Sequence, residues 1–142
     1  HRALLMAALA TGPSIIRNPL KAEDTVLTAA ALEQLGAQIH WDDAGPKILL
    51  TPPKQRWSQP LQPIMLGNSG TSMRLLLGLV ATGSGKFLLD GSPRLRERPI
   101  GPILDALQKL GIGHRCLENP GFPPVEIDSR GLTVGVEINM NA

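Results

Sequence analysis

Apolar and polar residues follow a helical period in some segments of this 142-residue chain and a strand period in others. Helices of almost wholly apolar sequence, expected to be buried all round, are predicted over 2–11 and 72–82. Helices of mixed polarity are predicted over 23–35 and 99–110, the second with Pro99 in its first turn. Strand-like runs occur at 14–17, 37–41, 47–51, 64–66, 86–89, 112–117, 124–128 and 132–138. This alternation predicts an α/β fold.

Two of these helices recur in the same order and at nearly the same spacing. The sequence Arg-Ala-Leu-Leu-Met-Ala-Ala-Leu-Ala-Thr-Gly (2–12) resembles Arg-Leu-Leu-Leu-Gly-Leu-Val-Ala-Thr-Gly (74–83). Ala-Leu-Glu-Gln-Leu-Gly (31–36) resembles Ala-Leu-Gln-Lys-Leu-Gly (106–111). We interpret this as a duplicated βαβαββ unit, the alternative being chance similarity of Ala/Leu-rich helices. Unit one covers about 1–60, unit two about 61–131, and 132–142 begins a third.

A turn of small residues leads directly into the second apolar helix. It reads Gly-Asn-Ser-Gly-Thr-Ser-Met-Arg (67–74), in which Ser69 or Thr71 is a fitting N-cap. Glycine lets a ligand approach the backbone, and a helix N-terminus with Arg74 one turn in favours an anion. Taken alone, such a turn is more typical of an ordinary capped helix.

A basic loop, Asp-Gly-Ser-Pro-Arg-Leu-Arg-Glu-Arg-Pro-Ile-Gly (90–101), enters the next helix at the same end of the unit. If the loop is extended, Arg94 and Arg96 point to one side. Glu97 and Arg98 are interpreted as a structural pair at the helix start. Guanidinium groups bind carboxylates and phosphates in a bidentate way. The turn and the loop together predict a pocket for a small, multiply anionic ligand rather than for a polymer.

Composition narrows the function further. A net charge of +2 and 3% aromatic residues argue against a nucleic-acid surface. The single cysteine, Cys116, excludes an internal disulfide and fits a reducing compartment. No apolar run reaches the roughly 18–20 residues of a membrane span. His40 and His114 occupy equivalent places in the two units but lack companion ligands, so no metal is expected. The chain begins within a predicted helix, and we expect it to be a fragment of a longer protein.

At four segments the sequence resembles the EPSP synthase family: 1–10, 66–74, 93–101 and 119–124. The resemblance implies an enolpyruvyl transferase-like inside-out α/β domain of repeated βαβαββ units with buried helices, of which this chain is part of the N-terminal domain. It implies transfer of an enolpyruvyl group from phosphoenolpyruvate to the 5-hydroxyl of shikimate 3-phosphate, with release of phosphate, in aromatic amino-acid biosynthesis. It further implies no cofactor, a monomeric cytoplasmic enzyme, and glyphosate as an inhibitor.

By the same resemblance, Arg2 contacts shikimate 3-phosphate, whereas Gly70 and Arg94 contact phosphoenolpyruvate. Asn68, Thr71 and Arg74 shape the turn. The resemblance places the acid/base groups outside this chain, so we expect the isolated fragment to fold but to be inactive. Leu75 departs from the family, many members of which have proline there.

Two other classes remain as alternatives. UDP-N-acetylglucosamine enolpyruvyl transferase shares the fold and the chemistry, but its members usually carry a cysteine in the loop that here reads 90–99, which has none. A module like RNA 3′-terminal phosphate cyclase is the second, and the low net charge and the arginine-rich loop argue against it.

Overall fold

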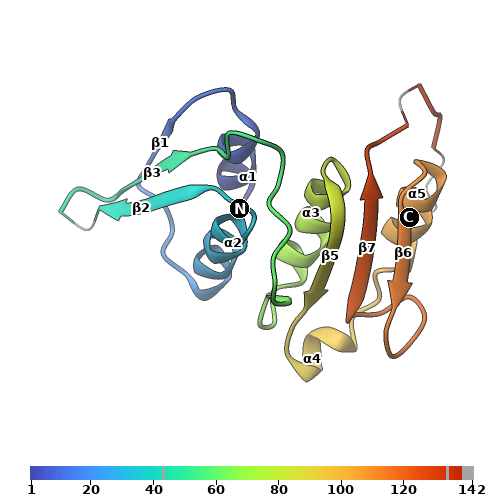
Figure 1. Cartoon of the computed structure of the whole chain (residues 1–142). Coiled ribbons are helices and arrows are strands. Elements are labelled where there is room, and N and C mark those ends of the chain that lie inside the picture. Colours follow the sequence, from blue (N-terminus) through green and yellow to red (C-terminus); the bar gives the residue numbers. More distant parts are fainter. Residues whose placement is uncertain (43, 134, 139–142) are drawn as a thin grey trace.

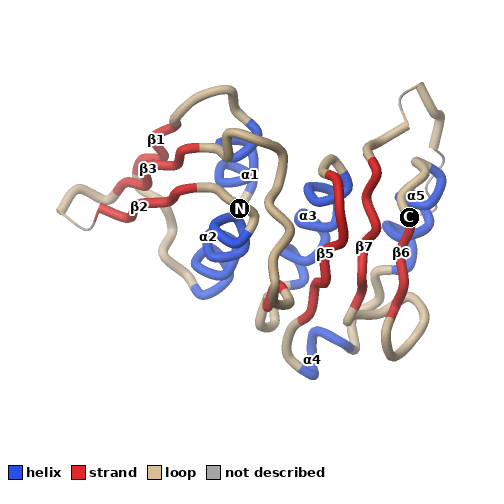
Figure 2. Tube along the Cα trace, viewed as in Figure 1, coloured by secondary structure: helices blue, strands red, loops and turns tan. Residues whose placement is uncertain are grey.

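The computed structural model describes residues 1–42, 44–133 and 135–138. The chain folds into two consecutive α/β parts, shown by sequence colour in Figure 1 and by element type in Figure 2. The first part contains α1 (Arg2–Leu9), β1 (Ser14–Arg17), α2 (Glu23–Gln34), β2 (Gln38–Asp42) and β3 (Lys47–Thr51). The second contains β4 (Ile64–Met65), α3 (Gly70–Ala81), β5 (Ser84–Asp90), α4 (Pro93–Arg96), α5 (Gly101–Lys109), β6 (Gly113–Cys116) and β7 (Val125–Arg130).

Each part builds its own sheet, and the two sheets share one topology. The first has the order β1-β3-β2 with antiparallel pairs only. The second has the order β4-β5-β7-β6, in which β4 runs parallel to β5 and the other pairs are antiparallel. The order β5-β7-β6 therefore repeats β1-β3-β2.

The helices repeat this correspondence. In the first part α1 packs on β1 and β3 and α2 packs on β2, and in the second α3 packs on β5 and β7 and α5 packs on β6. Along β7, Val125, Ile127 and Ser129 are buried while the residues between them are more exposed, so the helices cover one sheet face only. The predicted duplication is confirmed for the order αβαββ, whereas the leading strand of the βαβαββ unit, β4, occurs among the described residues only in the second part. The unit boundaries and the third unit stay predictions.

The second helix of each unit ends in the same way. Gly36 and Gly111 follow α2 and α5 with φ of 102° and 82°. Their amides donate to Glu33 O (2.9 Å) and Gln108 O (3.0 Å), which closes the last helical turn. Glycine adopts this left-handed conformation without the steric cost of a Cβ. The predicted helix ends are therefore confirmed.

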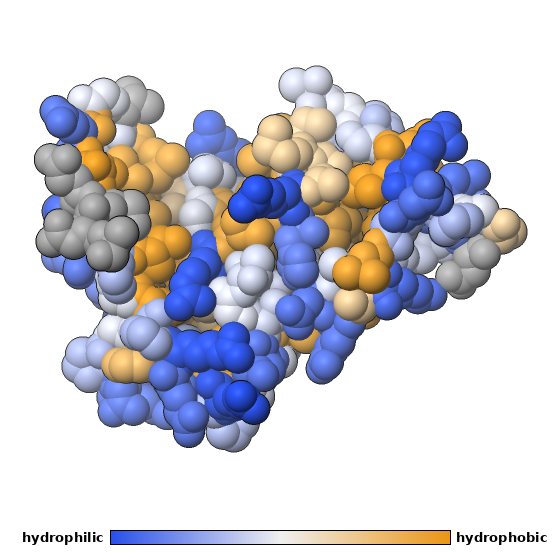
Figure 3. All heavy atoms as spheres, turned by 180° about the vertical axis from the view of Figure 1, so that it is seen from behind, coloured by the Kyte–Doolittle hydropathy of each residue, from blue (hydrophilic) through white to orange (hydrophobic). Residues whose placement is uncertain are grey.

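The units join through α2, which packs against α3 and β4. Helix α3 lies between its own sheet and α2, and most of its side chains are buried. The prediction that the first helix is buried all round is wrong for α1. Its side chains Met6 and Leu9 are 69% and 52% exposed. No described element packs over that side of α1, and Figure 3 shows apolar residues reaching the surface on the face opposite to that of Figure 1.

Two further predictions are wrong. The described residues of 132–138 form no strand, because none of them pairs with a described neighbour in a sheet. Helix α5 begins at Gly101 rather than at Pro99, and Pro102 is the proline in its first turn.

Candidate anion-binding site

The turn before α3 begins the helix earlier than the sequence predicts, at Gly70. Ser69 is the N-cap, and its Oγ accepts the amide of Ser72 at 3.3 Å. The buried Ser72 hydroxyl lies 2.6 Å from Ser69 Oγ and 2.7 Å from Thr28 Oγ1, and Thr28 donates to Asp24 O at 2.8 Å. This buried polar network fixes the start of α3 against the first turns of α2. Ser72 and Thr28, unlike Ser69, carry no charge or period that identifies them in the sequence.

The basic loop is not extended. Residues Pro93–Arg96 form the short helix α4, in which Ser92 Oγ accepts the Leu95 amide at 3.2 Å and Pro93 occupies the first turn. Ser-Pro before a charged run is the sequence signal that predicts such a helix. Residues two apart in a helix point in different directions, so the prediction that Arg94 and Arg96 share a side is wrong.

Backbone hydrogen bonds hold this loop against the 67–74 turn. The amide of Ser92 donates to Gly67 O at 2.7 Å, and that of Leu66 donates to Asp90 O at 2.9 Å. A Cβ on Gly91 would lie 2.5 Å from Gly67 O, so only glycine permits this approach. The two segments that the sequence singles out therefore meet.

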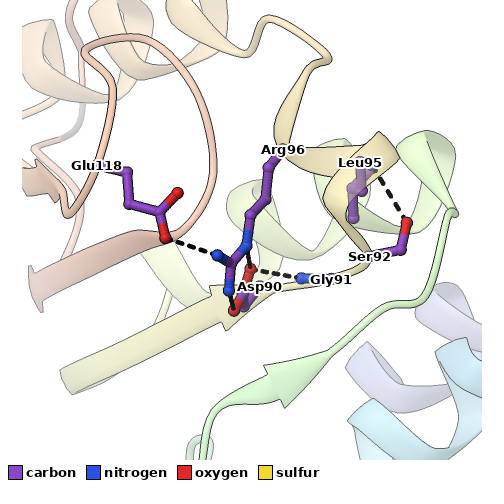
Figure 4. A network of polar contacts seen from close by, with 6 residues as sticks. All are labelled: Asp90, Gly91, Ser92, Leu95, Arg96 and Glu118. Atoms are coloured by element: carbon purple, nitrogen blue, oxygen red, sulfur yellow. Dashed lines mark hydrogen bonds and ion pairs between the residues drawn. The ribbon is translucent and has the colours of Figure 1, made fainter.

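Arg96 is bound by carboxylates, as Figure 4 shows. Its Nε and Nη2 donate to Asp90 Oδ1 (2.9 Å) and Oδ2 (2.6 Å), and its Nη1 donates to Glu118 Oε1 at 2.6 Å. The hydrogen bond with Asp90 is the main cause that raises the pKa of Arg96 above its ordinary value. Arg96 thus ties the end of β5 to the loop after β6.

Two other arginines lie over Gly70. Arg98 Nη1 and Arg74 Nη1 are 3.0 Å and 3.1 Å from the point that a Cβ on Gly70 would occupy. Arg74 also donates to Gly70 O (3.1 Å) and Pro99 O (2.9 Å). Arg98 makes no ion pair with Glu97 or with any other described residue, so the predicted structural pair is wrong. Sequence reasoning missed Arg98 as a neighbour of Gly70.

The remaining candidates lie at the surface. Asn68 and Thr71 are exposed beside Gly70 on the turn. Arg94 is exposed on α4, and within the described residues its side chain has no hydrogen bond or ion pair. The same holds for Arg2 at the start of α1. Helix α1 packs on α2, and α2 packs on α3. The site therefore combines arginines that protein groups bind with arginines that they do not, beside a turn in which Asn68 and Thr71 are exposed and Gly70 is buried.

A cavity of about 350 Å³ lies elsewhere, lined by residues 8–10, 52–57 and Thr82. Thr82 follows the last turn of α3, roughly 18 Å along the helix from Gly70. Arg56 there donates to Thr82 O at 2.8 Å, and the carbonyl ends of α1 and α3 disfavour an anion. The 67–74 turn is the better anion site.

No group of three or more potential metal ligands occurs among the described residues. His40 lies on β2 and His114 on β6, at the equivalent places that the repeat predicts. None of the described helices is both long and apolar enough to cross a membrane.

Comparisons with known proteins agree with this architecture. The family model described as EPSP synthase (3-phosphoshikimate 1-carboxyvinyltransferase) matches residues 1–142. A protein of that name from Syntrophobacter fumaroxidans is 53% identical over 95% of this chain, and one from Methanospirillum hungatei is 45% identical over 90%. A solved EPSP synthase from Acinetobacter baumannii has a TM-score of 0.84 and 28% identity over 92% of this chain.

The chain spans 31% and 29% of the length of these two curated relatives and 29% of that solved chain. The fold that it shares with them is the enolpyruvyl transferase fold, as the resemblance implied. The chain belongs to the EPSP synthase family.

Proposed function

We propose that this chain is part of an enzyme that transfers the enolpyruvyl group of phosphoenolpyruvate to the 5-hydroxyl of shikimate 3-phosphate. The new bond joins the hydroxyl oxygen to the enolpyruvyl carbon, phosphate leaves, and the hydroxyl proton is released. Family membership supports the reaction. It favours this reaction over that of UDP-N-acetylglucosamine enolpyruvyl transferase and over an RNA 3′-terminal phosphate cyclase-like activity.

The observation that carries the proposal for this chain is the unbound guanidinium of Arg94. Ser92, the N-cap of α4, is held on the turn by its backbone hydrogen bond to Gly67 O, and Arg94 follows two residues later with an exposed side chain. An unpaired guanidinium suits the carboxylate or phosphate of phosphoenolpyruvate. In this proposal Arg2, in the first unit, binds shikimate 3-phosphate. Asn68, Thr71 and Arg74 shape the 67–74 turn.

The test uses the complete protein that contains this chain, with phosphate release measured with both substrates and with each one omitted. Arg94→Ala is expected to weaken phosphoenolpyruvate binding by about 1.5–3 kcal/mol, a 10- to 150-fold rise in Kd, with little effect on shikimate 3-phosphate. Arg2→Ala is expected to do the reverse. Absence of phosphate release by the wild-type protein, or equal effects of both variants on both ligands, contradicts the proposal.

The proposal places the acid/base groups outside this chain, so the isolated 142 residues are expected to release no phosphate. Glyphosate carries a carboxylate and a phosphonate and is expected to compete with phosphoenolpyruvate for the same arginines. The complete enzyme is proposed to be a cytoplasmic monomer without a cofactor. Competition calorimetry, sedimentation and cell fractionation test these points separately.

A further inference from the structure

We propose that Arg98 is a further ligand-binding residue of this site, and that its guanidinium, which lies over Gly70, donates to an oxyanion of a small molecule bound there. The ligand class is a compact carboxylate- or phosphate-bearing anion. The identification of this ligand as phosphoenolpyruvate rests on the proposed function. Its chemical class does not rest on that function.

The position of Arg98 supports this role. Its Nη1 and Cδ are 3.0 Å and 3.5 Å from the point that a Cβ on Gly70 would occupy, and Arg74 Nη1 is 3.1 Å from the same point. Two guanidinium groups thus reach one face of one glycine. A methyl group there would displace both, so the absence of a side chain at Gly70 is what lets the two guanidinium groups cover this buried residue.

The three neighbouring arginines differ in their partners. Arg74 donates to two backbone carbonyls, and Arg96 is bound by two carboxylates. Arg98 is partly buried, and its side chain has no hydrogen bond or ion pair with any residue in the described part of the chain. Glu97, beside it, is exposed and unpaired with it. Arg98 therefore keeps all five of its N–H donors available.

The electrostatics of this arrangement favour an anion. Arg98 and Arg74 carry like charges over the same residue, with no described carboxylate between them, so they repel each other in the free chain. An oxyanion placed between them replaces this repulsion by two attractions, and its oxygens match the planar guanidinium fork.

The backbone around Arg98 is already fixed before a ligand binds. Its amide donates to Leu95 O at 3.0 Å at the end of α4. Arg96, two residues earlier, is held by Asp90 and Glu118. Binding then requires ordering of one side chain rather than of a loop, which limits the entropic cost.

The experiment measures the affinity of the complete protein for inorganic phosphate and for phosphoenolpyruvate by calorimetry. Arg98→Ala is expected to raise Kd for both at least about tenfold, because a charge-assisted hydrogen bond is lost. Arg98→Lys keeps the charge and the stem, and a smaller rise is expected because an ammonium lacks the planar fork. Arg115→Ala is the matched control, since that side chain is 71% exposed on β6, and both Kd values are expected to stay unchanged.

Thermal unfolding separates a ligand-binding role from a structural one. The ligand-free Arg98→Ala protein is expected to keep the wild-type midpoint, because no protein partner is lost, while its stabilisation by phosphate is reduced. The inference is wrong if Arg98→Ala binds both anions with wild-type affinity. It is also wrong if Arg98→Ala lowers the thermal midpoint of the ligand-free protein and the alanine and lysine variants lose equal affinity. Failure of the wild-type protein to bind either anion also overturns it. If the protein binds phosphate through Arg98 but catalyses no transfer, the inference stands and the proposed function fails.

Discussion

Gly91 offers the sharpest test of how the basic loop is held on the turn. A Cβ at this position would lie 2.5 Å from Gly67 O and 3.2 Å from Leu95 Cβ, with Leu95 Cδ2 closer still. Gly67 O is also the acceptor for the Ser92 amide at 2.7 Å. The φ of Gly91 lies outside the left-handed region, so alanine is allowed by its backbone and the cost of Gly91→Ala comes from these contacts alone.

Two terms give the expected magnitude. Forcing a methyl group into a packed site costs about 1–3 kcal/mol, and a lost backbone hydrogen bond adds about 0.5–1.5 kcal/mol. We therefore expect Gly91→Ala to lower the free energy of unfolding by about 2–4 kcal/mol. At roughly 4 °C per kcal/mol for a chain of this size, the thermal midpoint falls by about 8–16 °C. Displacement of α4 also moves Arg94, so under the proposed function the affinity of the complete protein for phosphoenolpyruvate is expected to fall.

Gly78→Ala is the matched control. Gly78 is exposed within α3, and a Cβ there would meet nothing within 4 Å. Alanine in a helix interior is expected to stabilise by about 0.5–1 kcal/mol. Urea and thermal unfolding measure the stability of both variants relative to the wild-type chain. If Gly91→Ala is as stable as the wild-type chain, the close approach of the loop to Gly67 is not what holds the site together.

Three more outcomes are expected. Arg96→Ala lowers the thermal midpoint because it leaves the buried Asp90 carboxylate without its guanidinium partner; an unchanged midpoint contradicts this. The hydrogen bond from Lys47 lowers the pKa of Asp42, so the stability it contributes is present above the ordinary value of 3.8 and is lost as pH falls through the lower folded value. Lys47→Met should therefore raise the Asp42 pKa toward 3.8 in an NMR titration. Ser72→Ala removes two buried side-chain hydrogen bonds and should cost about 1–2 kcal/mol in urea unfolding.

Local features of the site were predictable and long-range ones were not. The place before an apolar run marked Ser69 or Thr71 as the N-cap, of which the structure has Ser69, and the small-residue turn marked Gly70. The carboxylates that bind Arg96 come from β5 and from the loop after β6, and their approach depends on how β5, β6 and β7 align. A sequence pattern specifies which residues are basic but not which of them meet a carboxylate. Arg96 and Arg98 have the same chemistry in the sequence and opposite environments in the fold.

The sequence by itself determined the repeated α/β unit, because helix and strand periods, capping residues and terminal glycines are local properties that recur in both copies. It also singled out the two segments that meet at the candidate anion site. Only the tertiary structure decided that α1 keeps an exposed apolar side, that residues 93–96 form a helix, and that Arg98 rather than Arg96 faces Gly70. These depend on contacts between segments far apart along the chain, where packing and charge pairing override local preference.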